Sequence, residues 1–245
     1  MYKISIRCLQ FMVYLAVSIY LSGGITMEQF KHHVSLHKDG TYSVGVSIDQ
    51  GYMTPDDFAV LSELAKKYEV TSLMATTAKK INFMDVKEAN VNPLWEDLEQ
   101  TFGDRLCFPK GKIIVCPGSK FCKFATPGKD NHAMGREIER ISKAHEAGKV
   151  KVGVSCCLLG CAMPRVRDLG VLATAKGWML TVGGNGGSKP GVGDVIAQDL
   201  TDEELLALLD KVYQYLQDNK DGKERSIRTI ERLGVDHLKA AVLGE

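Results

Sequence analysis

The sequence has almost no net charge, no internal repeat and no low-complexity tract. Its 31 lysines and arginines are balanced by 30 aspartates and glutamates, so 245 residues carry a formal charge of +1. This balance excludes the whole-protein positive field that is typical of nucleic-acid-binding proteins, and any binding of anions must depend on local groups. The chain is long enough for one large or two small domains.

The sequence also lacks a recognisable nucleotide-binding motif. Its most glycine-rich stretch, VGGNGG at residues 182–187, fits neither the G-x-G-x-x-G fingerprint at a strand-to-helix turn nor the Walker A motif. No flavin or nicotinamide motif is present elsewhere. A redox reaction on this chain therefore needs an external electron donor.

The apolar run at residues 11–21 is too short to cross a bilayer, which takes about 20 apolar residues. We treat residues 1–26 as an apolar N-terminal extension with two interpretations. Lys3 and Arg7 ahead of the run are typical of a signal peptide or a membrane anchor. Alternatively Met27 is the biological start, because MEQFKHHVSL reads as an ordinary cytosolic N-terminus.

Apolar periodicity and capping residues predict an α+β chain. Residues 40–102 give the order strand, helix, strand, strand, helix, and the first of these helices starts at Thr54. Asn131 is the expected cap of a later helix, and Thr201 with Glu204 forms the expected capping box of another. The further elements are predicted as strands at 113–115, 151–155, 169–173 and 178–182 and as helices at 131–147, 201–219, 224–233 and 235–243.

Four of the seven cysteines form two spaced pairs. Five residues separate Cys116 from Cys122, and three separate Cys157 from Cys161. A 4Fe-4S cluster needs four thiolates, and two short loops can supply two each. Zinc, the first alternative, usually takes cysteines with about two to four residues between them. Disulfides and buried structural thiols are further alternatives, and the adjacent Cys156 is interpreted as a small buried filler.

This pattern resembles the nitrite and sulfite reductases, which couple a 4Fe-4S cluster to siroheme. The resemblance continues through CPGSKFC, CAMPRVRDLGV, the glycine run, Lys189–Gly191 and ERSIRTIERLGVDHL, in the order of the family. One departure lies at residues 156–159, where Cys-Cys-Leu-Leu replaces the family's usual Gly-Cys-Pro-Asn. The resemblance implies a ferredoxin-like half-domain at residues 27–103, followed at residues 104–245 by a 4Fe-4S/siroheme α/β domain with C-terminal helices.

The resemblance also implies roles for individual residues. The metal ligands are Cys116, Cys122, Cys157 and Cys161, and Cys161 bridges the cluster to the siroheme iron. The residues that face the carboxylates of siroheme are two cations and a glycine-rich loop with one asparagine, namely Arg165, Arg167, Gly183, Gly184, Asn185 and Gly186. Catalytic cations that polarise the oxyanion and deliver protons are Lys79, Lys80, Lys112 and Lys120. Solvent-facing lysines and structural salt bridges of the arginines are the alternatives.

The implied activity is reduction of sulfite to sulfide, or of nitrite to ammonia, with electrons from an external donor such as ferredoxin. One alternative is a 4Fe-4S electron-transfer protein of the same fold without siroheme, and another is a zinc-stabilised binding module. The chain has one half-domain and one cluster domain, so we expect a homodimer or a second subunit. We expect no nucleic-acid partner. A cytoplasmic location follows from the family, in which cluster and siroheme insertion is normally cytoplasmic.

Overall fold

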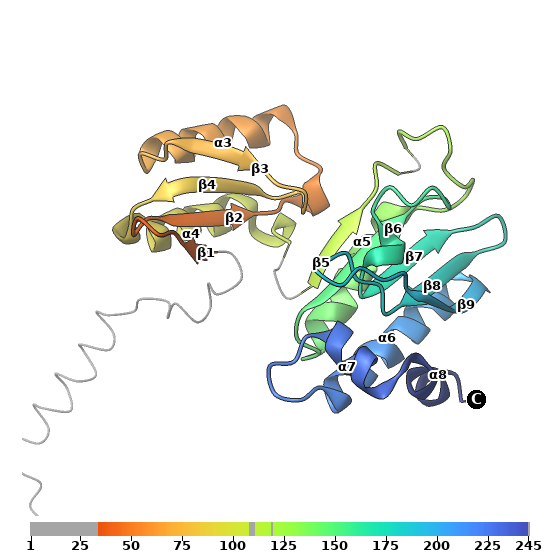
Figure 1. The fold of residues 1–245 in the computed structure, drawn as a ribbon. Coiled ribbons are helices and arrows are strands. Elements are labelled where there is room, and N and C mark those ends of the chain that lie inside the picture. Colours follow the sequence, from red (N-terminus) through yellow and green to blue (C-terminus); the bar gives the residue numbers. More distant parts are fainter. Residues whose placement is uncertain (1–33, 108–110, 119, 245) are drawn as a thin grey trace, which may run out of the picture.

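The computed structural model describes residues 34–107, 111–118 and 120–244, except for the side chains of residues 111 and 112. These residues form two antiparallel or mixed sheets, each with its own helices (Figure 1). The predicted α+β class is confirmed. The extension at residues 1–26 lies outside the described residues. Among the helices that the structure describes, none combines the length and the apolar character that a membrane span requires.

The first sheet has four antiparallel strands in the order β1-β2-β4-β3. The strands are β1 (Val34–Leu36), β2 (Tyr42–Val46), β3 (Ser72–Ala75) and β4 (Ile81–Val86). Every residue of β2 is buried, whereas every residue of β3 is exposed. The core of this unit therefore lies around the central strands, and β3 is an edge strand of the sheet as far as the structure describes it.

Two helices pack on this sheet. In α3 (Pro55–Lys67), Thr54 accepts a hydrogen bond from the backbone N–H of Asp57, and Asp57 accepts one from the backbone N–H of Thr54. This capping box fixes the start of the helix. In α4 (Glu88–Phe102), Pro93 lies within the helix and the apolar face packs on the sheet. The shared core contains Val44, Leu61, Phe83, Leu94, Trp95 and Leu98.

The second sheet has five strands in the order β5-β6-β7-β8-β9. The strands are β5 (Gly111–Val115), β6 (Val150–Ser155), β7 (Leu169–Ala173), β8 (Trp178–Val182) and β9 (Asp194–Leu200). β5, β6 and β7 pair in parallel, whereas β8 pairs antiparallel with both β7 and β9. The strands predicted at 169–173 and 178–182 are confirmed as β7 and β8, which pair antiparallel. Because β5 and β6 are neighbouring parallel strands, their carboxyl ends lie at the same edge, and both cysteine pairs follow those ends.

Four α-helices belong to the second unit over the residues that the structure describes. They are α5 (Asn131–Ala144), α6 (Asp202–Asn219), α7 (Ser226–Leu233) and α8 (Val235–Leu243). The predicted box at the start of α6 is confirmed, because Thr201 and Glu204 cap each other's backbone N–H groups. The core between these helices and the sheet includes Ile138, Val152, Val171, Trp178, Leu209 and Leu216.

Candidate functional site

Cys116 follows β5 directly and is buried. Its Sγ accepts hydrogen bonds from the backbone N–H of Cys156 (3.1 Å) and from Nδ2 of Asn131 (3.4 Å). N–H groups that point at a cysteine sulfur stabilise the thiolate, which is the form that binds iron. The surroundings of Cys116 therefore suit a metal ligand.

A tight turn brings Cys122 back toward Cys116. Its backbone N–H donates to the carbonyl oxygen of Gly118 (2.9 Å). Gly118 has a φ of +82°, and a Cβ at this position would lie 2.3 Å from Oδ1 of Asn131. A left-handed backbone and a close contact coincide here, so the turn between the two cysteines requires glycine.

The second cysteine loop follows β6 and contacts the first. The backbone N–H of Thr126 donates to the carbonyl oxygen of Cys156 (2.8 Å). Burial raises the pKa of the Cys156 thiol, and its hydrogen bond with Cys116 raises it further, so Cys156 stays protonated. Both loops share an apolar cluster of Ile114, Cys116, Cys156 and Ala162, with Cys122, Ala125 and Cys157 packed against it.

Cys161 lies on the same loop as Cys157 but is exposed. Within the described residues, no group of three or more His, Cys, Asp or Glu side chains is close enough to hold a single metal ion. A cubane cluster is bound at its corners, so its four sulfur ligands lie further apart than those around one ion. Four cysteine sulfurs from two adjoining loops therefore fit a 4Fe-4S cluster as a donor set. The assignment of the four ligands stays a prediction.

After Cys161 the chain crosses the sheet in close contact with glycines. Gly153 of β6 and Gly170 of β7 lie opposite each other in register. A Cβ at Gly153 would lie 2.7 Å from the carbonyl oxygen of Ala162, and one at Gly170 would lie 2.3 Å from that of Pro164. Glycine within a strand often marks such an approach of another backbone. These two glycines fix the position of the loop that carries Cys161.

The two predicted siroheme-binding arginines lie at the end of this crossing. Arg165 is exposed, and Arg167 is half-buried. Nε of Arg167 is buried and has no hydrogen-bond partner among the described residues. A guanidinium in this state is a donor that the carboxylate of a bound group can satisfy.

The predicted glycine run packs directly on the arginine segment. A Cβ at Gly184 would lie 2.5 Å from the carbonyl oxygen of Arg165, so glycine here lets the two backbone segments approach each other closely. Gly183 has a φ of +81°, and Gly186 is exposed. Gly184 therefore positions the arginine segment.

Asn185, which is also predicted to bind siroheme, is buried and bonds within its own loop. Its Nδ2 donates to the carbonyl oxygen of Lys189 (2.8 Å), and its Oδ1 accepts from the backbone N–H of Gly187 (3.1 Å). Both ends of the amide are thus engaged. In this structure Asn185 shapes the loop.

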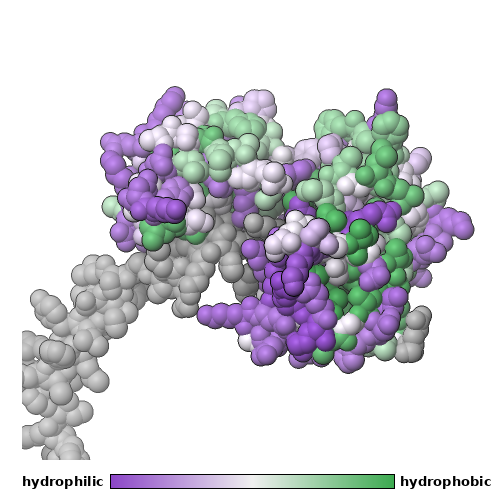
Figure 2. Space-filling model, viewed as in Figure 1, coloured by the Kyte–Doolittle hydropathy of each residue, from purple (hydrophilic) through white to green (hydrophobic). Residues whose placement is uncertain are grey.

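Both cysteine loops expose large apolar side chains and cations. Those exposed by at least 44% are Phe121, Phe124, Leu158, Leu159 and Met163. Figure 2 shows apolar surface over the part of the second unit where these loops lie in Figure 1. Lys120, Lys123 and Arg165 are exposed on the same loops. An apolar surface edged with cations fits a flat, acidic macrocycle, since it can cover the apolar atoms and pair with the charges.

Lys79 reaches from the first unit to the first cysteine loop. Its ammonium group donates to the carbonyl oxygen of Val115 and lies 5.7 Å from the centroid of the Tyr52 ring. Burial lowers the pKa of Lys79, while negative charge at Cys116 acts in the opposite direction. A lysine of lowered pKa releases a proton more readily than an exposed one.

The other three predicted lysines are placed differently. Lys120 is exposed on the cysteine loop, with its Nζ 5.5 Å from the centroid of the Phe121 ring. Lys80 is half-buried, and its backbone N–H donates to Oγ1 of Thr76 (3.2 Å). Lys112 lies on β5, but its side chain is outside the described atoms. The structure thus brings Lys79 and Lys120 to the first cysteine loop.

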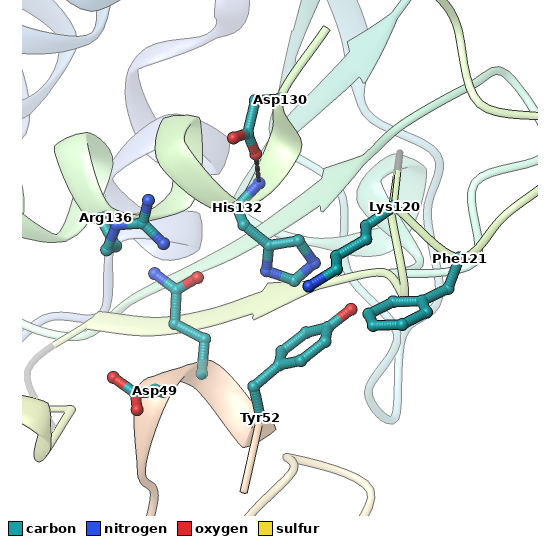
Figure 3. A pocket seen from close by; sticks show the side chains of 8 residues that line it. Asp49, Tyr52, Lys120, Phe121, Asp130, His132 and Arg136 are labelled. Carbon is teal, nitrogen blue, oxygen red and sulfur yellow. Dashed lines mark hydrogen bonds between the residues drawn. The ribbon is translucent and has the colours of Figure 1, made fainter. Parts of the chain in front are cut away.

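A cavity of about 460 Å³ lies beside this loop, between the two units (Figure 3). The 3-10 turn η1 (Asp49–Gly51) and the residue after it form one wall, and the cysteine loop and the start of α5 form the others. Its lining is Asp49, Gln50, Tyr52, Lys120, Phe121, Asp130, His132 and Arg136. In Figure 3 the ammonium group of Lys120 points between the rings of His132 and Tyr52.

The polar groups of the cavity that have no partner are mainly donors. Gln50 is only 3% exposed, and its Nε2 has no hydrogen-bond partner among the described residues. Asp49 is paired with Arg105 (2.6 Å), and Asp130 caps α5. Within the described part of the chain, no carboxylate lies within salt-bridge distance of Arg136. The cavity therefore favours an anion.

Two aromatic groups in the cavity carry protons. The Tyr52 hydroxyl donates to the carbonyl oxygen of Pro117, and its ring meets the His132 ring edge-on at 4.1 Å. Burial does most to raise the pKa of Tyr52, and burial also does most to lower the pKa of His132. At neutral pH Tyr52 is thus protonated and His132 is largely uncharged.

Gln50, Tyr52 and Arg136 had no signal in the sequence. Gln50 and Tyr52 follow a strand in a stretch that reads as a turn, and Arg136 is one of several charged residues on a helix. They meet only because η1 packs against β5 and α5. Their grouping depends on contacts between residues more than 60 positions apart in the chain, which local patterns do not report.

Known proteins resemble the whole described chain. The family model for the nitrite/sulfite reductase ferredoxin-like half domain matches residues 35–101, and that for the nitrite and sulphite reductase 4Fe-4S domain matches residues 110–245. An assimilatory-type sulfite reductase of Nitratidesulfovibrio vulgaris is 33% identical over 205 residues, which cover 83% of this chain and 93% of the relative. An NAD(P)H nitrite reductase of Bacillus subtilis is 32% identical over 86% of this chain, but the match spans only 26% of that enzyme.

Two solved structures share the fold. The NirA protein of Mycobacterium tuberculosis matches 85% of this chain and 41% of its own, with a TM-score of 0.67 at 20% identity. Dissimilatory sulfite reductase I (DsrI) matches 99% of this chain and 82% of its own, with a TM-score of 0.69 at 11% identity. With a family model over residues 110–245 and a relative at 33% identity, the chain belongs to the nitrite and sulfite reductase family, as an oxidoreductase of this type with a 4Fe-4S domain.

Proposed function

We propose that the chain reduces sulfite to sulfide, with nitrite as the second candidate substrate, and that it uses a 4Fe-4S cluster and siroheme for the reaction. The observation that carries the proposal is the meeting of the two cysteine loops at one sheet edge, beside a cavity of uncommitted donors. The relative that matches this chain over most of its own length is named a sulfite reductase, which supports sulfite as the first substrate to test.

In this proposal the cluster is held by Cys116, Cys122, Cys157 and Cys161. Siroheme would be held by the apolar side chains of the cysteine loops, and Arg165 and Arg167 would pair with its carboxylates. When bound, siroheme supplies the iron at which the oxyanion is reduced. A donor such as ferredoxin supplies the electrons, because the chain has no flavin or nicotinamide motif. We place this activity in the cytoplasm.

The cavity residues, and Lys79 beside the ring of Tyr52, have separate tasks in binding and protonation. Arg136 and Lys120 attract the oxyanion, and Nε2 of Gln50 donates a hydrogen bond to it. Lys79 supplies protons, which are needed because each oxygen atom leaves as water. Tyr52 keeps its proton and holds the cavity wall against the cysteine loop through Pro117.

The test of the cofactors is an absorption spectrum of the protein purified without air, with iron and sulfide counts. Isobacteriochlorin bands and about five irons per chain are expected, and turnover of sulfite and nitrite with a chemical reductant follows. About four irons without those bands would contradict the proposal and favour an electron-transfer protein. Zinc in place of iron would contradict both.

The test of the cavity is Arg136→Gln, with Arg140→Gln as the matched control. Arg140 is on the same helix but is paired with Glu137 and does not line the cavity. Losing one cation that binds the oxyanion should raise KM roughly tenfold, the effect of about 1.4 kcal/mol, with kcat less affected. An unchanged KM in Arg136→Gln, or an equal rise in Arg140→Gln, would place the oxyanion elsewhere.

A further inference from the structure

Three consecutive backbone carbonyl groups of the first cysteine loop, those of residues 115–117, each accept a hydrogen bond from a side chain. The first accepts from the ammonium group of Lys79, the second from Nδ2 of Asn131 (3.1 Å) and the third from the hydroxyl group of Tyr52. Asn131 belongs to α5, whereas Lys79 and Tyr52 belong to the first unit. The first unit therefore contacts the backbone on both sides of Cys116.

Two unusual backbone conformations direct Lys79 to this loop. Lys79 itself has a φ of +55°, which is uncommon for any residue except glycine and persists only where the surrounding structure enforces it. Gly51 has a φ of +93°, and a Cβ at this position would lie 2.8 Å from Cβ and 2.9 Å from Cδ of Lys79. Glycine at residue 51 thus leaves room for the aliphatic part of Lys79 to reach the cysteine loop.

The positive charge of Lys79 has no carboxylate partner within salt-bridge distance among the described residues. The side chain is half-buried, and its ammonium group contacts the carbonyl oxygen of Val115 and the ring of Tyr52. A cation that is partly removed from water is costly unless a negative charge compensates it. Burial lowers the pKa of Lys79, and the negative charge that opposes this shift is that of Cys116. The thiolate of Cys116 is therefore the counter-charge of Lys79.

We propose that Lys79 is a positioning residue for the cluster, and that its positive charge, held beside Cys116 by the half-domain, raises the reduction potential of the cluster. Four thiolates make a bound cluster negative, and reduction adds a further negative charge. A cation fixed near a ligand therefore stabilises the reduced form more than the oxidised form. The first unit thus tunes the cluster although it contains none of the four predicted ligands. The inference rests on the proposed cluster, but not on siroheme or on the choice of oxyanion.

The experiment is a redox titration of the full chain, purified without air and followed by electron paramagnetic resonance of the reduced cluster. Lys79→Met keeps an unbranched apolar side chain and removes the charge. Its cluster should be roughly tenfold harder to reduce, which equals a potential lower by about 59 mV for a one-electron couple. Lys79→Arg keeps the charge, so its potential should lie closer to that of the parent than to that of Lys79→Met.

Two further variants separate the charge of Lys79 from other effects. Lys87→Met removes the same charge from the same unit, but Lys87 is exposed and paired with Glu69, so the potential should not change. Tyr52→Phe removes a neutral donor to the same loop and should shift the potential less than Lys79→Met does. The proposal is overturned by a parent-like potential in Lys79→Met, by an equal fall in Lys79→Arg, or by an equal fall in Tyr52→Phe.

Iron and sulfide counts on the same samples separate this inference from the proposed function. A parent protein without a cluster would overturn both. A parent with a cluster whose potential does not respond to Lys79→Met would overturn the inference alone and leave the proposed reaction standing. A cluster without siroheme bands would contradict the proposed reaction, whereas a fall of its potential in Lys79→Met would still support the role of Lys79.

Discussion

Asp130 and Asn131 divide two tasks at the start of α5. The sequence predicted Asn131 as the helix cap, but the carboxylate of Asp130 accepts from the backbone N–H groups of His132 and Ala133 instead. The side chain of Asn131 instead donates to Sγ and to the carbonyl oxygen of Cys116. Both residues are good caps, and pattern alone does not tell which one faces a sulfur that is distant in sequence.

Asn131→Leu should lower the reduction potential of the cluster by tens of millivolts. An N–H group that donates to a ligand sulfur favours the more negative, reduced form, so its loss makes reduction harder. A redox titration followed by electron paramagnetic resonance measures the shift. Asp130→Asn keeps a capping side chain that does not touch the sulfur, and because it removes a negative charge it should shift the potential, if at all, upward and not downward. Equal potentials in Asn131→Leu and the parent would remove Asn131 from the surroundings of the cluster.

At the scale of elements, Arg105 ties three segments of the first unit together. It follows α4 in the 3-10 turn η2 (Gly103–Arg105), and its guanidinium donates to both carboxylate oxygens of Asp57 (2.8 and 2.7 Å). Its Nε donates to Asp49 in η1 (2.6 Å). The hydrogen bonds from the Arg105 guanidinium do most to hold the pKa of Asp57 well below its usual range. The hydrogen bond from the backbone N–H of Thr54 lowers this pKa further.

Asp57→Asn should destabilise the chain at pH 7 by about 1.5–3 kcal/mol, the range for hydrogen bonds to charged groups. Asp57 has a lower pKa folded than unfolded, so its contribution is fully present above the unfolded value of about 3.9. It is lost as pH falls toward the folded pKa. Urea unfolding at a series of pH values should show the variant and the parent converging below about pH 4. A stability difference that does not change with pH would show that the charge of Asp57 is not the cause.

Much of the secondary structure could be predicted, because capping residues and apolar periodicity are local. The helix start at Thr54 and the capping box at Thr201 are where the sequence placed them. Strand β9 was missed, since most of its residues are polar or exposed and give no clear alternation. The crossing of the chain over Gly153 and Gly170 was also missed. Isolated glycines in strands do not tell which distant backbone approaches them.

At the scale of the whole molecule, the candidate site lies where two units with separate cores meet. The core of the first unit and that of the second share no buried residue. Contacts such as those of Tyr52 with Pro117 and of Lys79 with Val115 join them beside the cysteines. The cysteine pairs themselves were visible in the sequence because ligand spacing is local. The cavity beside them was not, because it exists only once the two units are packed together.

The two tryptophans of the chain report on the two cores separately. Trp95 lies in the core of the first unit and Trp178 in that of the second. Trp95→Phe therefore leaves a probe of the cluster unit, and Trp178→Phe leaves a probe of the half-domain. Urea unfolding followed by fluorescence should give different midpoints in the two variants, because each core loses its own buried surface.

Removal of iron should distinguish the units further. All the predicted ligands belong to the second unit, and a group that binds only the folded state stabilises the unit that holds it. Chelation should lower the midpoint that Trp178 reports in Trp95→Phe and leave the midpoint that Trp95 reports in Trp178→Phe nearly unchanged. If both probes shift together, the contacts around Tyr52 and Lys79 couple the two cores into one cooperative unit. In that case the half-domain helps to hold the cluster through the wall of the cavity.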